Sequence, residues 1–376
     1  MKSMEDALGA LINLKRAIDA GPFDAVIASS PENVRYVGDV GVWTQTVIRE
    51  RPVFIVWPKG RDPVYIVGTM EVARIREETW IRDIRTCEQT AASALDELVV
   101  ALRDLHLDRG RIAIERGYMP ARWVDHLCTA LPHLVIEEAE TIFASARMRK
   151  SVAEREHLAR AYKSTGDAFL ATFRDIRVGE TEREAATRLT TNLLRAGADA
   201  PAFTFLCGGT NSLLPHPAPS GHAFGRDEMI TSDSGGMFND YFTNLGRTAK
   251  LGPLTSEDRS YWGKLRDIQQ RIADMLRPGN TGRQLYQRAC ELHLRAGLAP
   301  PNTHNGHGIG LRIHERPMIS AHEDTPYEPG MMSTVETRCF LPGRHAYHME
   351  DLYEVTAGPP ILHVGQFSSE EVLVVA

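Results

Sequence analysis

Hydrophobic positions in the first 140 residues alternate between helical spacing and short continuous runs. Residues Leu8, Leu11, Leu14 and Ile18 lie three or four positions apart, which predicts an amphipathic helix. The short apolar runs are bounded by turn residues and predict strands, and the proline-flanked segment 58–63 predicts a hairpin turn between two of them. Strands alternating with helices favour an α/β domain. The predicted elements are helices over 4–20 and 91–105 and strands over 24–28, 53–57, 64–67 and 111–114.

A different pattern begins near Arg147. Residues 152–176 form a long, charged, amphipathic stretch that predicts a single helix. A connecting helix after a completed α/β unit is a natural domain boundary. We therefore expect two domains, over residues 1–147 and 148–376.

The second half of the chain contains an internal repeat. Segment 178–197 recurs as segment 278–297 with a constant offset of 100 residues and eight identities. Each copy predicts a helix, a glycine turn and a second helix that ends at Arg-Ala-Gly, where glycine suits the helix stop. The alternative is two unrelated helices with similar caps. Eight identities at one constant offset are better explained by a duplication of the segment. A duplicated helix–helix–strand unit would pack about a pseudo-twofold axis, with a site between its halves.

Composition narrows the function classes. The chain is 43 % hydrophobic and 24 % charged, which is ordinary for globular proteins and excludes disordered and collagen-like chains. Its net charge is -6 with no basic block, so we expect no nucleic-acid partner. No apolar run approaches the roughly 18 residues of a membrane helix. Glu5 and Asp6 and the lack of an apolar stretch argue against a signal peptide. Five widely spaced cysteines without a CxxC pair predict free thiols, mostly buried, in a reducing cytoplasm.

Ten of the 14 histidines lie after residue 200, and chemistry-bearing residues gather there. His216 stands between two prolines, which restrict its backbone and suit a fixed hydrogen-bonding role, although alone it is better explained as a loop histidine without a role. Asp233 precedes a Gly-Gly turn, and Asn244 follows on the next strand signal. A hairpin would bring both to one face, where their oxygens can ligate a hard cation. Taken alone, Asp233 could equally mark an ordinary turn.

Two further patterns follow. His307 lies between glycines that permit close backbone approach, and His314 follows it after a strand-like stretch. The motif is not HExxH, so a helical zincin site is excluded. Glu336 and Glu350 each end a strand-like run, where an unpaired glutamate would be costly. A metal or a basic side chain is the expected partner, although either residue alone could be an outward surface glutamate.

Together these residues form a donor set of one imidazole nitrogen and four oxygens. Such a set suits Mn²⁺, Fe²⁺, Co²⁺ or Zn²⁺. His216 and His314 could handle protons or a developing oxyanion. The combination suggests metal-activated water attacking a carbonyl or a similar carbon. The candidate ligands are Asp233, Asn244, His307, Glu336 and Glu350.

These motifs resemble the pita-bread superfamily, which includes creatinase, Xaa-Pro aminopeptidase and dipeptidase, and methionine aminopeptidase. The resemblance rests on Gly306–Gly310 with His314-Glu315, on Pro31–Tyr36 followed by Gly38, on the boundary near residue 148 and on the repeat. It implies an α+β protein with two domains, an N-terminal α/β creatinase-type domain and a C-terminal pseudo-twofold pita-bread catalytic domain.

The resemblance implies roles for single residues. In the metallopeptidase members five ligands hold two divalent ions, and Asp233, His307, Glu336 and Glu350 match four of them. Asn244 falls where an aspartate usually bridges the two ions. His216 and His314 match histidines that bind substrate and steady the tetrahedral intermediate, and Glu336 is a candidate to share the proton.

The resemblance also implies a homodimer in which an N-terminal loop of one subunit reaches the other's site. Arg49 and Arg51 could bind a substrate carboxylate from there, although a solvated surface pair is the simpler explanation for them. His348 is a third candidate for substrate binding.

This chain departs from the peptidase pattern. Asn244 lowers the charge of the ligand set to -3 and bridges poorly, because an amide nitrogen cannot ligate. His348 stands where the peptidases usually have arginine, and Thr337-Arg338 follows Glu336 where Pro-Gly is usual. Creatinase works without metal and uses a histidine at the place of His216, but it lacks the first aspartate, which this chain keeps.

We therefore expect a cytoplasmic hydrolase that cleaves an amide or related C–N bond, Xaa-Pro peptidase-like with a degenerate metal site. The expected cofactor is a divalent metal (Mn, Fe, Co or Zn), as one or two ions or none. The alternative is a metal-independent, creatinase-like hydrolase or lyase acting on a small polar molecule. A peptide-binding module is disfavoured, because a binder has no need of the whole set. The expected partners are a small-molecule or short-peptide substrate and a second copy of the chain, with no nucleic acid and no membrane.

Overall fold

The computed structural model describes residues 3–48 and 50–375. The chain divides into two compact units, Met1–Arg147 and Met148–Ala376. One candidate residue, Arg49, lies outside the described residues.

The first unit is built on a six-stranded sheet in the order β4-β3-β2-β1-β5-β6. β1, β2 and β3 pair antiparallel, and the other pairs are parallel. The central strands are buried along their length, and apolar residues of α5 and α6 pack against them. The strands are β1 (Ala25–Ala28), β2 (Phe54–Pro58), β3 (Val64–Gly68), β4 (Asp83–Cys87), β5 (Arg111–Ile114) and β6 (Val135–Glu138). The helices are η1 (Met4–Asp6), α1 (Leu11–Ala20), α2 (Pro31–Gly38), α3 (Trp43–Val47), α4 (Val72–Glu78), α5 (Ala91–Asp104), α6 (Ala121–Ala130) and α7 (Glu140–Met148).

The predicted elements of this unit are confirmed except at its start. Residues 4–20 are not one helix, because the chain leaves helical geometry between η1 and α1. The Leu8 N–H donates to Asp39 Oδ1 at 3.1 Å, and a Cβ on Gly9 would lie 2.6 Å from the Tyr36 ring. These contacts with α2 and its C-cap residue Asp39 draw residues 7–10 out of the helical pattern.

The second unit contains a ten-stranded sheet whose main path is β12-β11-β13-β14-β10-β8-β7. Each half of the unit supplies two helices and then its strands, and the halves meet where β10 pairs with β14. The helices are α8 (Val152–Arg174), α9 (Glu182–Arg195), η2 (Gly209–Leu213), α10 (Ser256–Ala273) and α11 (Gly282–Arg295). The strands are β7 (Ala200–Gly208), β8 (Met229–Phe238), β9 (Tyr241–Phe242), β10 (Leu245–Leu251), β11 (His304–Gly308), β12 (Glu315–Ser320), β13 (Met332–Leu341), β14 (His345–Glu354), β15 (Ile361–His363) and β16 (Leu373–Val375).

The duplication predicted from the sequence is visible in matching local geometry. Thr181 and Thr281 cap α9 and α11 through the same capping box. Gly179 and Gly279 both have positive φ, 89° and 91°, which glycine adopts without strain. Their N–H groups donate to carbonyl oxygens 45 and 48 residues further along, those of Phe224 and Tyr327. The predicted two-domain α+β architecture with a pseudo-twofold C-terminal domain is confirmed.

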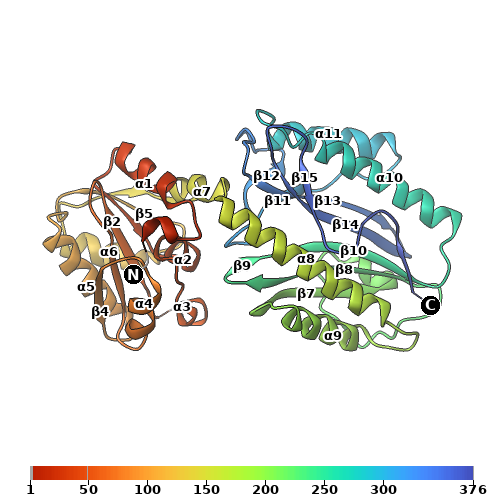
Figure 1. The fold of residues 1–376 in the computed structure, drawn as a ribbon, viewed down its shortest axis with the longest axis horizontal. Helices are drawn as coiled ribbons and strands as arrows, with labels where there is room; N and C mark the ends of the chain where they lie inside the picture. Colours follow the sequence, from red (N-terminus) through yellow and green to blue (C-terminus); the bar gives the residue numbers. More distant parts are fainter. Residues whose placement is uncertain (1–2, 49, 376) are drawn as a thin grey trace. The chain divides into compact units, whose positions relative to one another are not determined.

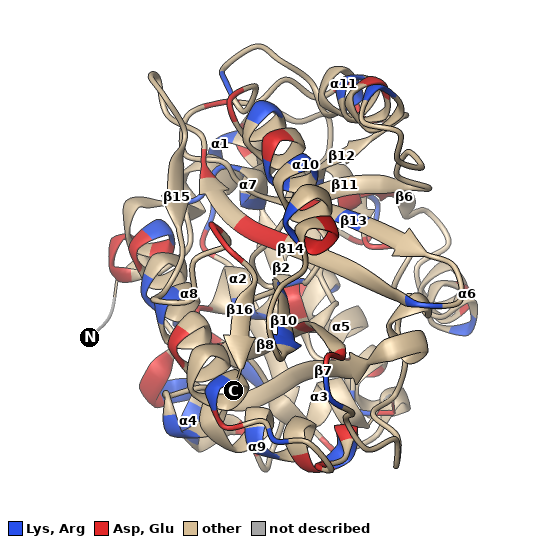
Figure 2. Ribbon diagram, turned by 90° about the vertical axis from the view of Figure 1, so that its right-hand side faces the viewer, with Lys and Arg blue, Asp and Glu red and all other residues tan. Residues whose placement is uncertain are grey.

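Helices α10 and α11 cover one face of the second sheet. Their apolar residues pack on Val335, Tyr347 and Met349, so the residues that alternate with these point to the opposite face. Figure 1 shows α8 and α9 beside β7 and β8, which belong to the same half of the unit as these two helices. Acidic and basic residues are interspersed along α8, α10 and α11 (Figure 2). Within residues 3–48 and 50–375, no helix is both long and apolar enough to cross a membrane.

One predicted turn is wrong. The glycines Gly235 and Gly236 lie inside β8, and the chain reverses instead at Asn239 and Asp240, which have φ of 48° and 67°. A Cβ on Gly235 would lie 1.7 Å from the Thr243 carbonyl oxygen. The glycine therefore serves a close approach between backbones and not a turn.

Candidate active site

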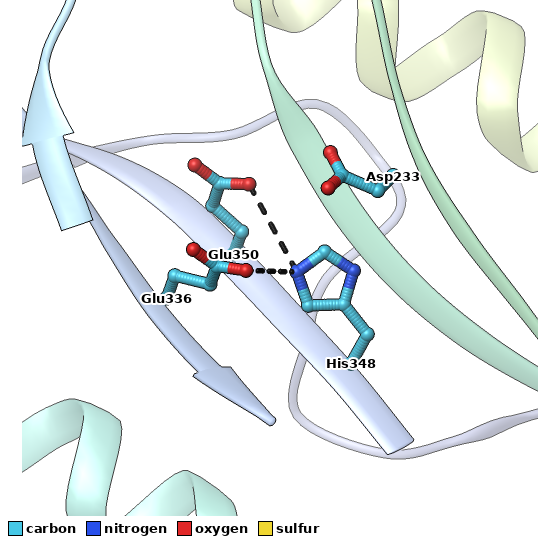
Figure 3. A group of neighbouring side chains, drawn as sticks. All are labelled: Asp233, Glu336, His348 and Glu350. Carbon is cyan, nitrogen blue, oxygen red and sulfur yellow. Dashed lines mark ion pairs between the residues drawn. The ribbon is translucent and has the colours of Figure 1, made fainter. Parts of the chain in front are cut away.

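Three carboxylates lie in one row across four neighbouring strands. The pairing register places Asp233 of β8 opposite Gly246 of β10, Gly246 opposite Glu350 of β14, and Glu350 opposite Glu336 of β13. The two glutamates are therefore mid-strand and direct neighbours, not at strand ends as predicted. One ligand atom from each of Asp233, Glu336, Glu350 and His348 lies within 4.8 Å of the others, and Figure 3 shows the four side chains gathered in one place.

Gly246 opens the space for this cluster. A Cβ at this position would lie 2.5 Å from the His348 ring and 2.9 Å from the Glu350 Cβ. Any side chain here would displace the imidazole or the carboxylate. The row therefore needs a glycine at the strand position between Asp233 and Glu350.

The cluster holds a cation supplied by the chain. Asp233, Glu336 and Glu350 are 8 %, 9 % and 0 % exposed, and buried carboxylates side by side repel one another. The guanidinium of Arg338 donates from Nε to Glu336 Oε1 and from Nη2 to Asp233 Oδ2. Its Nη1 donates to the Pro215 carbonyl at 3.2 Å. Arg338 thus joins two of the three carboxylates.

His348 stands beside this arginine and inside the cluster. Its Nε2 lies 3.0 Å from Glu336 Oε1 and 4.0 Å from Glu350 Oε2 (Figure 3). The residue is 3 % exposed. The sequence suggested a substrate-binding role, whereas this geometry places the imidazole among the candidate metal ligands.

Asn244 and His307 both face the third carboxylate. The Asn244 amide donates from Nδ2 to Glu350 Oε1 at 3.0 Å, and His307 Nε2 lies 3.3 Å from the same oxygen. The other ring nitrogen of His307, Nδ1, lies 2.9 Å from the Gly308 carbonyl. That carbonyl fixes the proton on Nδ1 and leaves Nε2 directed at the centre.

Three buried oxygens of the centre lack a hydrogen-bond partner among the described residues. They are Asp233 Oδ1, Asn244 Oδ1 and Glu350 Oε2. Buried acceptors of this kind are costly unless a cation or a water satisfies them. Together with an imidazole nitrogen they are a donor set that suits one divalent ion.

Charge pairing shifts the pKa values of these groups. Burial alone would raise the pKa of Glu336, but the charge of Arg338 and the contact with His348 hold that pKa well below its ordinary value. In Asp233 burial prevails and raises the pKa. Burial would lower the pKa of His307, but the contact with Glu350 and its charge raise it. The cationic groups beside Glu336 therefore favour its ionised form.

A second imidazole group borders the row. The ring of His314 lies tilted against that of His307, with 4.2 Å between ring centres, and meets the ring of His304 edge-on at 5.3 Å. Burial and the charges of these two rings lower the pKa of His314 to about 4, so it is neutral at pH 7. The predicted strand before His314 is wrong. Residues 309–314 form a loop, in which a Cβ on Gly310 would lie 2.8 Å from the Glu315 carboxylate.

The remaining candidates lie elsewhere. His216 is exposed, with its ring 5.2 Å from that of Phe205. The prolines on either side of His216 line a pocket together with Asp233, Arg338 and His348. Arg51 is half-buried in the first unit, where it lines a small pocket.

Two residues of the site were not predicted from the sequence. Arg338 was noted only as a departure from a motif, although a strand places residues i and i+2 on one face and so beside Glu336. His304, three residues before His307, is the second of them, and its Nδ1 lies 3.8 Å from Glu336 Oε2.

Comparisons with known proteins find relatives that match both units of the chain. Residues 156–357 match the model of Metallopeptidase family M24, and residues 11–149 match the Creatinase/Prolidase N-terminal domain. The Xaa-Pro dipeptidase of Lactobacillus delbrueckii subsp. lactis is 30 % identical over 348 residues, which cover 91 % of this chain and 92 % of that protein. The Xaa-Pro dipeptidase of Pyrococcus furiosus is 29 % identical over 222 residues, 58 % of this chain and 64 % of that protein. An Xaa-Pro dipeptidase structure from Bacillus anthracis shares the fold, with a TM-score of 0.85, 22 % identity and coverage of 97 % and 99 %.

Proposed function

The chain belongs to metallopeptidase family M24, and from this premise we propose that it hydrolyses an amide or related C–N bond, as an Xaa-Pro peptidase-like enzyme with a degenerate metal centre. Family membership confirms the resemblance indicated by the sequence motifs. The observation that carries the proposal is the row of Asp233, Glu350 and Glu336, bordered by His307 and His314.

The donor atoms of this row fit one divalent ion. Asp233 Oδ1, Asn244 Oδ1 and Glu350 Oε2 are its available oxygens, and His307 Nε2 is directed at the same place. Manganese is the first ion to test among those that accept such mixed ligands. A bound ion would acidify water and polarise the scissile carbonyl.

The side chains around the ion site have separable tasks. Arg338 and His348 hold Glu336 ionised and fixed in position. The side chain of His314 reaches solvent and its ring lies against that of His307, so an N–H of this ring can donate to the oxygen that becomes negative in a tetrahedral intermediate. His216 is the second candidate for this task, and Glu336 is the candidate to share the proton of the attacking water.

The substrate class follows from the pocket and the relatives. Apolar side chains of Phe205, Leu214 and Pro217 line the pocket that Asp233 and Arg338 close. Such side chains favour contact with an apolar part of a substrate. The relatives are named Xaa-Pro dipeptidases, so we take Xaa-Pro dipeptides as the first substrate class to test.

Several broader features belong to the same proposal. We propose that the enzyme is cytoplasmic and a homodimer, with the catalytic domain over 148–376 and the creatinase-type domain over 1–147. We also propose that Arg49, Arg51 and His348 bind substrate. Light scattering of the purified chain tests the dimer, and a monomer would contradict it.

The test is hydrolysis of an Xaa-Pro dipeptide panel by chelator-treated enzyme with and without Mn²⁺. We expect turnover that depends on Mn²⁺ and falls about 100-fold or more in His314→Ala, since one lost oxyanion donor costs that much. His322→Ala is the control, because His322 is an exposed loop histidine of the same unit. Turnover that survives exhaustive chelation would refute the metal-dependent form of the proposal.

A second function has its own support. Arg338 already neutralises two carboxylates, and the Asn244 amide binds the third. Because groups of the chain itself already bind each carboxylate, a metal-independent, creatinase-like hydrolase or lyase acting on a small polar molecule is the second candidate, with His216 as its acid–base group. Activity that resists chelation and is lost in His216→Ala would support this function, whereas normal turnover of His216→Ala would exclude it.

A further inference from the structure

We propose that Arg338 is the resident cation of this centre, that its guanidinium excludes a divalent ion from the space between Asp233 and Glu336, and that the centre therefore holds no more than one ion. The inference deepens the proposed function, because it concerns the same site. Its test needs no substrate, so the two can fail separately.

The geometry makes arginine and metal competitors for the same atoms. The guanidinium uses two of its nitrogens, one on Glu336 Oε1 and one on Asp233 Oδ2. A transition-metal ion that bridged these oxygens would stand about 2 Å from each. Guanidinium nitrogens already occupy that space, so either cation must displace the other.

The position of Arg338 is set by the sheet and not by a mobile loop. The residue lies inside β13, opposite His348 of β14, and its side chain is only 21 % exposed. A third nitrogen, Nη1, donates to the Pro215 carbonyl at 3.2 Å. Three separate acceptors therefore hold the planar group, which is the fork geometry that arginine provides and lysine does not.

The charges lead to the same limit. The three carboxylates bring three negative charges, and Arg338 brings one positive charge. The remainder balances one divalent ion, whereas two ions would leave excess positive charge in a buried site. The oxygens without partners, on Asp233, Asn244 and Glu350, are enough to receive that one ion and are not shared with Arg338.

The test counts ions and measures their effect on stability. Chelator-treated wild type, Arg338→Ala and Arg338→Lys are titrated with Mn²⁺ by calorimetry, bound metal is counted by mass spectrometry, and melting temperatures are recorded with Mn²⁺ and with chelator. We expect at most one ion per wild-type chain. In Arg338→Ala we expect a second ion, or at least tenfold tighter binding, and a lowered melting temperature that Mn²⁺ restores.

Arg316→Ala is the matched control, because Arg316 also binds a buried glutamate, Glu323, with two nitrogens but lies outside the centre. Its Mn²⁺ binding should equal that of wild type. Two ions in wild type would overturn the inference, as would Arg338→Ala with unchanged stoichiometry and affinity. If Arg338→Ala fails to fold even with Mn²⁺, Arg338→Lys decides. Its compact charge reaches one carboxylate, so tenfold tighter Mn²⁺ binding supports the inference and unchanged binding overturns it.

Discussion

Arg338 and His348 lie directly opposite each other on β13 and β14, two residues along from the cross-strand pair Glu336 and Glu350. All four side chains share one face of the sheet, because side chains alternate along a strand. Two carboxylates and two basic groups thus form one block on a single hairpin. A slip of one residue in this register would turn the block into the helix-covered face.

Gly246→Ala tests the space that this block requires. The new methyl group would lie within 2.6 Å of the His348 ring, so the imidazole or the strand must move. We expect a loss of about 1–3 kcal/mol in the free energy of unfolding, as for overpacked cores. We also expect weaker metal binding. Urea denaturation and metal titration measure the two effects.

Gly263→Ala is the control for this change. Gly263 lies inside α10, and an added Cβ there would meet nothing within 4 Å. Alanine should raise stability by up to about 1 kcal/mol, since glycine is the poorer helix former. If Gly246→Ala were as stable as wild type, the space around Gly246 would be less crowded than the distances to His348 and Glu350 indicate.

Asn244→Asp tests the amide that binds Glu350. The Asn244 amide donates to Glu350 at 3.0 Å, and a carboxylate there would repel Glu350 instead. Without metal we expect a loss of about 1–3 kcal/mol, the cost of an unsatisfied buried acceptor. Mn²⁺ should restore this stability and bind more tightly than in wild type. Melting temperatures with chelator and with Mn²⁺ give the comparison.

Asn211→Asp is the matched control for the asparagine. Its amide donates to the buried Glu182 at 3.0 Å, so the same substitution creates the same repulsion away from the centre. We expect a similar loss of stability that Mn²⁺ does not restore. Equal behaviour of the two variants in Mn²⁺ would contradict a metal-linked role for Asn244.

The sequence predicted those features that depend on local pattern. The helices of the repeat follow from apolar spacing and from caps such as Thr181 and Thr281, which act within a few residues. The strands of the first domain follow from short apolar runs between turns. The candidate ligands follow from local residue patterns such as those around Asp233 and His307, and the superfamily resemblance then implied their roles.

The remaining features depend on pairings between distant segments. Arg338 meets Asp233 across 105 residues, and only the register of four strands brings them together. Gly235 resembled a turn residue, because its real constraint, the Thr243 carbonyl, belongs to another strand. The loop before His314 was misjudged for a similar reason, since Phe242 donates to the Gly310 carbonyl and draws that segment out of an extended path.

The two helix caps of the repeat predict a pair of equal effects. Thr181 accepts from the Glu184 N–H at 3.3 Å, and Thr281 accepts from the Gln284 N–H at 3.4 Å. Each Thr→Ala change should cost about 1 kcal/mol, as N-cap losses do. Because the caps belong to different halves, the double variant should show the sum within about 0.5 kcal/mol. Urea denaturation of the three variants measures this, and a strongly unequal pair would argue against equivalent halves.

An ion pair outside the centre should control acid stability. Glu323 is 4 % exposed and accepts from Arg316 at 2.7 and 2.9 Å and from the Thr325 N–H at 3.0 Å. Burial alone would raise the pKa of Glu323, but these donors lower it from 4.5 to about 2. As the pH falls, the unfolded chain therefore takes up this proton first. The stabilisation is complete above about pH 4.5 and is lost between there and pH 2.

Glu323→Gln removes this dependence. The Arg316 side chain is 47 % exposed, so solvent screening reduces the contribution to about 1–2 kcal/mol. The variant should be less stable than wild type by that amount at pH 7, and the difference should shrink toward zero as the pH approaches 2. Urea denaturation at pH 7, 4 and 3 tests this. Glu370→Gln is the control, because Glu370 is 75 % exposed beside Arg266 and should shift stability little at any pH. A constant difference between Glu323→Gln and wild type from pH 7 to 3 would show that the Glu323 carboxylate acts by shape and not by charge.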